Sequence, residues 1–186
     1  MKPTALHFTG DAEADALLAA EPLALLIGFA LDQQVTVQSA FAGPLKLRQR
    51  LGTLDAKTIA ATDPDRLLEI FRERPAIHRF PGAMATRVQE LCAFVAEEYG
   101  GDAARLWTKA TDTADLTKRI GALPGYGPMK ITALGSVLAL RFGVAVADPL
   151  VPPHACLGAV DSPQALADYQ AKKRAHKAEL RAAKAG

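Results

Sequence analysis

The sequence Leu-Pro-Gly-Tyr-Gly-Pro-Met-Lys at residues 123–130 constrains the fold most strongly, because it turns the chain sharply just before an apolar helix at residues 131–142. Gly125 and Gly127 let the backbone adopt positive φ and approach another surface, and Pro128 suits the first turn of a helix. Free backbone N–H groups at such a helix start favour a phosphate. A plain connector between two packed helices would use the same residues, so the turn alone leaves both interpretations open.

The residues on either side of this turn have helical patterns. Residues 113–121 predict a helix that ends at the turn, so the unit as a whole is a helix-hairpin-helix. A further amphipathic helix is expected through Val88, Leu91, Cys92 and Val95, which recur with helical spacing before two glycines. Other helices are expected at residues 11–20, 23–31, 37–51, 55–61 and 63–72. The segment at residues 23–31 is apolar nearly all round, which predicts a central, buried helix.

Strand signals are scarce. Only residues 144–147, Val-Ala-Val-Ala, show the alternation of side chains that is typical of a strand, and this stretch is too short to form a sheet. We expect a brief extended segment there that leads to Asp148, followed by a proline-rich loop over residues 149–158 and a terminal helix that starts near Asp161. The sequence therefore predicts an all-α protein.

Composition narrows the class of protein. A chain of 186 residues with 49% hydrophobic content can form a core in one domain or two small lobes. Trp107 is expected to anchor that core, and the Cys92 thiol is expected to be buried and inert. Two isolated cysteines exclude a disulfide framework or a cysteine-rich metal site. The apolar runs are too short to cross a bilayer, so we expect a soluble, cytoplasmic protein.

The net charge of +2 says little about binding partners, but the charged residues are unevenly distributed along the chain. From Lys172 onward, six basic residues stand against the single acid Glu179. A basic helix of this kind favours a polyanion such as nucleic acid, although a solvated terminal helix would have the same composition.

Two further stretches attract attention. Gln33 and Gln34 follow a wholly apolar helix, where amides need partners, so they either bridge helix ends or bind a ligand. The loop at residues 75–82 carries Arg79 beside Phe80, a pairing suited to a phosphate and a base. A phenylalanine in such a loop also commonly packs onto the body of the protein.

The order of these features resembles a known family. Asp-Gln-Gln after an apolar helix, a glycine-bounded amphipathic helix, Leu-Pro-Gly-Tyr-Gly, a second apolar helix and then an aspartate follow one another. This order is similar to that of the helix-hairpin-helix (HhH-GPD) superfamily of base excision DNA glycosylases, in particular to the relatives of endonuclease III and 3-methyladenine glycosylase. The resemblance covers roughly residues 21–148. It implies a fold of two helical lobes over residues 1–158, with a basic helix over residues 159–186.

The resemblance also implies a function. A member of this family removes a damaged or mismatched base from duplex DNA by flipping it into a cleft between the lobes and hydrolysing its N-glycosidic bond. The hairpin residues Gly125, Tyr126, Gly127 and Lys130 would then hold a DNA phosphate, often together with a monovalent cation. Gln34 would fill the gap left in the base stack, and Phe80 would wedge the opposite strand beside Arg79.

The resemblance implies Asp148 as the catalytic carboxylate, which would stabilise the sugar cation as the base departs. An Asp-Pro turn without a catalytic role is the alternative. An enzyme should show a base-sized cleft with Asp148 at its floor. Bifunctional members carry a lysine at the start of the second hairpin helix. Alignment on the glycines puts Met129 there, whereas counting back from Asp148 gives Lys130, and we favour the glycines and hence a monofunctional enzyme.

No iron–sulfur cluster is expected, because the family's cluster requires four cysteines near the C-terminus. The expected partner is duplex DNA with a damaged base, bound by a monomer that requires no metal. The alternatives are a bifunctional glycosylase and AP lyase if Lys130 reaches the cleft, a DNA-binding module that has lost the chemistry, and a helical scaffold unrelated to DNA.

Overall fold

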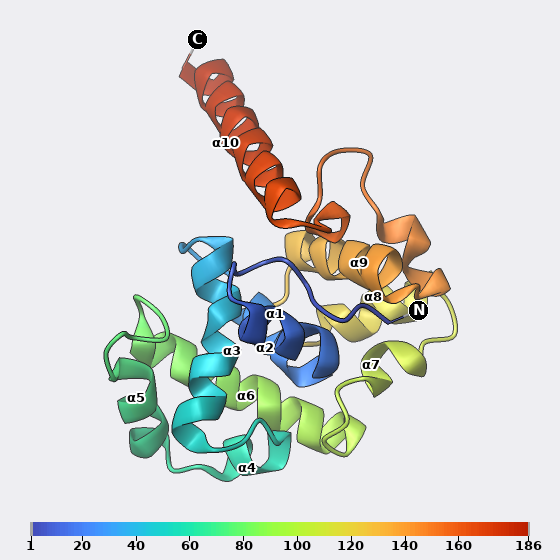
Figure 1. Cartoon of the computed structure of the whole chain (residues 1–186). Coiled ribbons are helices and arrows are strands. Elements are labelled where there is room, and N and C mark those ends of the chain that lie inside the picture. Colours follow the sequence, from blue (N-terminus) through green and yellow to red (C-terminus); the bar gives the residue numbers. More distant parts are fainter. Residues whose placement is uncertain (1, 186) are drawn as a thin grey trace.

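A computed structural model describes residues 2–185 of the chain (Figure 1). Its α-helices are α1 (Ala12–Ala20), α2 (Pro22–Leu31), α3 (Val37–Leu51), α4 (Ala56–Ala61), α5 (Pro64–Arg72), α6 (Pro81–Tyr99), α7 (Arg105–Thr108), α8 (Thr113–Gly121), α9 (Pro128–Phe142) and α10 (Pro163–Ala185). Two short 3₁₀ helices, η1 (Ala145–Leu150) and η2 (Leu157–Ala159), lie between α9 and α10. Residues 2–185 include no strand, which confirms the all-α prediction.

The apolar helix α2 is at the centre of the molecule, as its composition predicts. All of its residues from Leu23 to Leu31 are buried, and it packs against α1, α3 and α6. Gly28 allows α3 to approach closely, because a Cβ atom there would lie 2.4 Å from the Phe41 ring. Trp107 and Cys92 are buried as expected.

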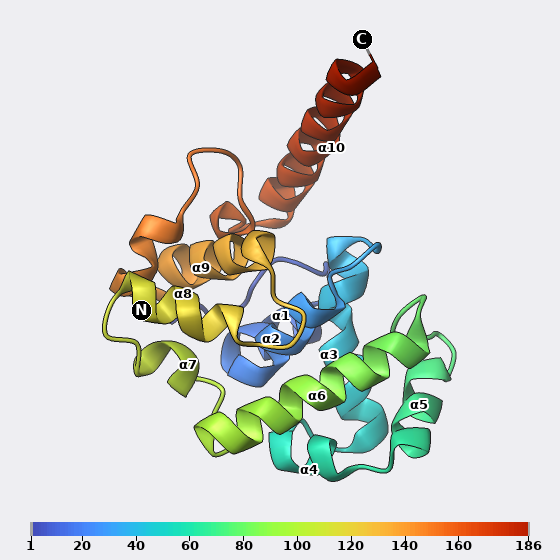
Figure 2. The same cartoon turned by 180° about the vertical axis from the view of Figure 1, so that it is seen from behind.

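The helices form two groups (Figures 1 and 2). Helices α1 to α6 pack on one another, with α6 running across α4 and α5. The second group comprises α7, α8 and α9 with η1 and η2. The connection between α8 and α9 turns back toward α2, so the predicted hairpin lies where the two groups meet (Figure 2).

The expected helix ends follow from local chemistry. Asp55 and Asp63 each accept a backbone N–H of the helix that follows them, as N-caps do. Gly100 ends α6 in the left-handed conformation, at φ 65°. Helix α6 begins at Pro81, so the last two residues of the segment expected to be a loop, residues 75–82, belong to the helix.

The segment after Gly143 differs from its prediction. It forms the 3₁₀ helix η1 (Ala145–Leu150) rather than a brief extended segment. Tertiary contacts explain the difference: Leu150 packs against Gly135, where a Cβ atom would lie 2.6 Å from it, and the Thr113 hydroxyl donates to the Val146 carbonyl at 2.8 Å. Neither contact is visible in the local sequence.

No single helix within residues 2–185 has the length and apolar character needed to span a membrane. Helices α1 and α2 meet the criterion only as a pair, and they are bent by 115° at their junction.

Candidate functional site

The hairpin between α8 and α9 depends on one of its two glycines for its shape. Gly125 has φ +78°, and a Cβ atom there would lie 2.1 Å from Nη1 of Arg87. Gly127 differs from the expectation, because it has φ −94° and ψ −176° and open space around it. The backbone N–H groups of both glycines have no partner within the described chain. The hairpin therefore presents bare donors at the start of α9, which suits an anion.

Tyr126 anchors this hairpin to the core. Its side chain is buried, and its hydroxyl donates to the Leu26 carbonyl of α2 at 2.6 Å. Burial raises the pKa of the Tyr126 hydroxyl well above its usual value. The Tyr126 side chain thus fastens the hairpin to α2, and a role for Tyr126 in DNA binding stays a prediction.

The first turn of α9 directs Lys130 toward α2 and Met129 away from it. Met129 is 83% exposed, whereas Lys130 is half-buried and its Nζ donates to the Ala30 carbonyl at 3.4 Å. Burial lowers the pKa of Lys130 to about 8, and the charge of Arg87 lowers it further while that of Asp32 opposes the shift. Of the two residues that compete for the family's lysine position, the structure turns the one with an amine inward.

Asp32 and Gln33 complete a polar cluster around Lys130. In the amide orientation that satisfies its neighbours, Gln33 Oε1 accepts from Lys130 Nζ at 3.2 Å and from Arg87 Nη1 at 3.1 Å. Burial raises the pKa of Asp32, and the charges of Lys173 and Lys130 partly oppose this shift. The acidic group near Lys130 is therefore Asp32. We define Asp32, Gln33, Arg87 and Lys130 as the interlobe cluster.

Asp32, Arg87 and Lys173 were not among the predicted site residues, although the structure places their charges close together. Asp32 directly follows a buried helix and precedes two glutamines, which was the available signal. No sequence signal marks Arg87 as a site residue, because its position depends on the contact between α6 and the hairpin.

Gln34, Arg79 and Phe80 form an exposed edge beside this cluster. Gln34 has the left-handed φ of 55°, and its carbonyl accepts from Arg79 Nη1 at 3.4 Å. The Arg79 guanidinium lies 4.9 Å from the centre of the Phe80 ring, and that ring is 43% exposed. The structure thus brings together the residues for which sequence analysis predicted a role in DNA distortion. Their role stays a prediction.

His78 joins the two segments that carry this edge. Its Nε2 lies 3.1 Å from the carbonyls of both Leu31 and Gln33, and its Nδ1 accepts the Phe80 backbone N–H at 3.0 Å. This pattern assigns the proton to Nε2 and requires a neutral ring. Burial lowers the pKa of His78, which favours the same state.

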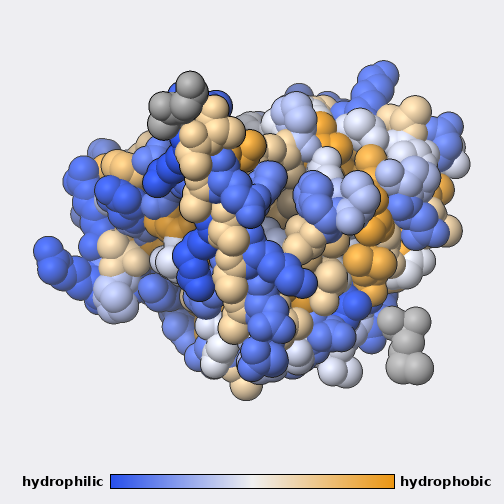
Figure 3. All heavy atoms as spheres, turned by 90° about the horizontal axis from the view of Figure 1, so that it is seen from above, coloured by the Kyte–Doolittle hydropathy of each residue, from blue (hydrophilic) through white to orange (hydrophobic). Residues whose placement is uncertain are grey.

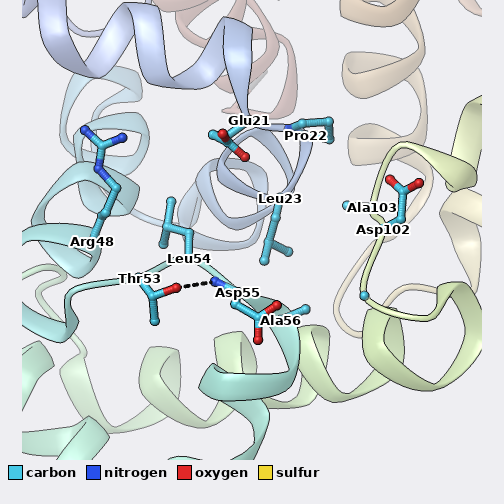
Figure 4. Close-up of a pocket in the computed structure, with 11 residues that line it drawn as sticks. Glu21, Pro22, Leu23, Arg48, Thr53, Leu54, Asp55, Ala56, Asp102 and Ala103 are labelled. Carbon is cyan, nitrogen blue, oxygen red and sulfur yellow. Dashed lines mark hydrogen bonds between the residues drawn. The ribbon is translucent and has the colours of Figure 1, made fainter.

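Asp148 was the predicted catalytic carboxylate. It is exposed on η1. One pocket, of about 430 Å³, is lined by Glu21, Arg48, Asp55 and Asp102 near the start of α2 (Figure 4). A second, of about 200 Å³, lies between η2 and α10. Asp148 lines neither of these two pockets, and a base-sized cleft with Asp148 at its floor stays a prediction.

The described residues offer no evident metal site. Residues 2–185 contain no group of three or more His, Cys, Asp or Glu side chains placed to hold a metal ion. Both cysteines are buried as free thiols, and burial raises the pKa of Cys92 to about 12.

Comparison with known proteins identifies one family. The family described as HhH-GPD superfamily base excision DNA repair protein matches residues 27–178 of the chain. Neither a curated protein nor a solved structure matches it. The family match covers α3 to α9 and includes the whole interlobe cluster.

Proposed function

Because the chain belongs to the HhH-GPD superfamily of base excision DNA repair proteins, we propose that it is a DNA N-glycosylase that flips a damaged or mismatched base out of the duplex and releases it. The bare N–H groups of Gly125 and Gly127 hold a phosphate of the lesion strand. Gln34 and Phe80 occupy and widen the gap that the flipped nucleotide leaves. A monovalent cation in the hairpin stays a prediction of the family resemblance.

The observation that carries the proposed chemistry is the position of Lys130. Its amine lies half-buried where the two helix groups meet, with a pKa lowered to about 8. About one molecule in ten then has a neutral Lys130 amine at pH 7. This supports a bifunctional glycosylase, in which Lys130 is the nucleophile, over the monofunctional enzyme that alignment on the glycines favours.

The reaction follows from the lone pair of this amine. The amine forms a bond to C1′ of the flipped nucleotide as the bond from C1′ to the base breaks. The base leaves with that electron pair and takes up a proton. The nitrogen then loses a proton to the ring oxygen as the sugar opens, which leaves a Schiff base between Lys130 and C1′. A carboxylate, either Asp148 or Asp32, stabilises the positive charge that develops on the sugar.

Single-turnover assays on duplexes that carry a panel of lesions test this proposal, with borohydride trapping of the Schiff base. We expect trapping in the wild type and its loss in Lys130→Ala. Met129→Ala is the matched control, because its exposed side chain lies one residue away on the same helix turn. Base release without trapping, lost in Asp148→Asn, would restore the monofunctional mechanism. Loss of release in Asp32→Asn but not in Asp148→Asn would assign the carboxylate to Asp32.

A non-catalytic DNA-binding protein is the second candidate. The observation that favours it is the exposure of Asp148 outside the pockets. This candidate predicts salt-dependent binding to duplex DNA and no base release from any lesion in the panel.

A further inference from the structure

The C-terminal helix α10 packs on the protein only through its first turns. Leu166 is buried and Tyr169 packs against the core, while Gln170 exchanges two hydrogen bonds with Gln38 of α3, at 2.6 and 3.2 Å. Residues 171–184 are all exposed. At 1.5 Å per residue this exposed part is about 20 Å long. Figures 1 and 2 show it projecting away from both groups of helices.

The exposed part of α10 gathers its positive charge on one face. Helical spacing at 100° per residue puts five basic side chains within a sector of about 100°. They are Lys173, Arg174, Lys177, Arg181 and Lys184, and we call them the basic face of α10. Ala171, Ala175, Ala178 and Ala182 lie on the opposite side. Figure 3 shows hydrophilic residues beside a column of weakly apolar ones on this projection.

The exposed residues of α10 do not form the apolar face that a helix uses to bind an apolar partner. Alanine favours the helix without needing burial, and Leu180 is the large apolar side chain exposed on α10. A coiled-coil partner would require apolar residues at regular seam positions, which α10 does not have. Charge complementarity therefore points to a polyanion as the occupant of this surface.

The basic face starts beside the interlobe cluster. Lys173 is close enough to Asp32 for its charge to influence that carboxyl group, and its Nζ lies 5.7 Å from the centre of the Tyr169 ring. The pair Gln38 and Gln170 fixes the direction in which α10 leaves the body. The first residue of the basic face thus lies within electrostatic reach of Asp32 in the interlobe cluster.

We propose that the basic face of α10 binds the sugar–phosphate backbone of the same duplex beside the lesion, without reading its sequence. This inference rests on the proposed function, because it takes duplex DNA to be the ligand of the interlobe cluster. Lysine and arginine side chains on this face neutralise phosphates and release their counterions, so the contribution depends on salt.

The test measures the affinity of the full-length protein for an undamaged duplex across a range of salt concentrations. One variant carries glutamine at all five positions of the basic face. The matched control carries five exposed cations changed to glutamine elsewhere, at Lys2, Lys57, Arg66, Arg72 and Lys109. Both variants have the same net charge. Their melting temperatures are compared with that of the wild type to establish that both are folded.

Each lost phosphate contact should reduce the slope of log affinity against log salt by about 0.9, so five contacts reduce it by up to about 4.5. We expect the slope of log affinity against log salt to be smaller in magnitude than that of the wild type by at least about 1 in the basic-face variant. In the control variant the reduction should be smaller. Equal slopes in the two variants would overturn the proposal. So would binding of the wild type to phosphatidylserine vesicles through these residues with duplex binding unchanged.

The outcomes separate this proposal from the proposed function. A reduced slope in the basic-face variant without base release by the wild type supports the role of α10 and refutes the enzyme. Base release by the wild type, with no reduction of the slope in the basic-face variant, supports the enzyme and refutes the role of α10.

Discussion

Replacing Lys130 by methionine tests the central feature of the site. An ordinary lysine has a pKa of 10.5, and that of Lys130 is lowered to about 8. At pH 7 an ordinary lysine is neutral in about one molecule in 3,000, whereas a lysine with a pKa of about 8 is neutral in about one in ten, an increase of about 300-fold. Together with the half-buried position of the amine, this increase is the basis for proposing Lys130 as the nucleophile.

Carbon-13 NMR of the lysine ε-carbons, titrated from pH 6 to pH 11, measures this pKa directly and without DNA. The resonance that disappears in Lys130→Met should have its midpoint near pH 8. Lys46 is the necessary comparison, because burial and Arg50 lower its pKa as well. In Asp32→Asn the midpoint of Lys130 should fall further, because the charge of Asp32 raises that pKa.

The same shift makes a prediction for stability. Between pH 8 and pH 10.5 the unfolded chain holds a proton on Lys130 that the folded protein does not, so stability should rise with pH in that window. Because the amine is only half-buried and solvent screens its charge, we expect this gain to be on the order of 1 to 2 kcal/mol. Denaturant unfolding at pH 7.5 and pH 10 should therefore show a smaller gain for Lys130→Met than for the wild type. A Lys130 midpoint at the ordinary pKa of 10.5 would refute the reasoning, and with it the assignment of the nucleophile.

Three further variants test how the site is supported. Gly158→Ala should destabilise the fold by several kcal/mol or prevent folding, because the added Cβ would lie 2.2 Å from the Ser136 carbonyl oxygen. The control is Gly82→Ala, where the added Cβ would have no neighbour closer than 3.9 Å. Thermal unfolding measures both variants. Tyr126→Phe should cost about 1 kcal/mol by losing the buried hydroxyl bond to α2, and an unchanged melting temperature would contradict that role for the hydroxyl. Because burial lowers the pKa of His78, the unfolded chain binds more protons below pH 6.5, so stability should fall on acidification, and urea unfolding should show a weaker fall in His78→Gln.

Local sequence signals predicted the helices and the hairpin well. The N-caps Asp55 and Asp63, the terminal Gly100 and the apolar run of α2 each act within one or two turns of chain, so no tertiary information is needed to read them. The same reasoning failed for η1, because contacts with Thr113 and Gly135 determine its path.

The site was less predictable because its partners are far apart in sequence. The contact between Lys130 and Ala30 spans 100 residues, as does that between Tyr126 and Leu26. One residue on a helix is about 100° of rotation, so a one-residue ambiguity between Met129 and Lys130 decides whether an amine faces inward. The contact of Lys130 with the end of α2 in the folded protein resolves it.

The carboxyl end of α2 explains why these groups meet. The last carbonyls of a helix carry partial negative charge, and here Ala30 accepts from Lys130 while Leu31 contacts the ring of His78. Arg87 approaches the same point through Gln33. Asp32 is the acid placed near Lys130, Arg87 and Lys173, so positive groups outnumber the negative one in this region. A phosphate that reaches the hairpin therefore meets the bare N–H groups of the turn and a cationic cluster behind them, an arrangement that the end of α2 organises.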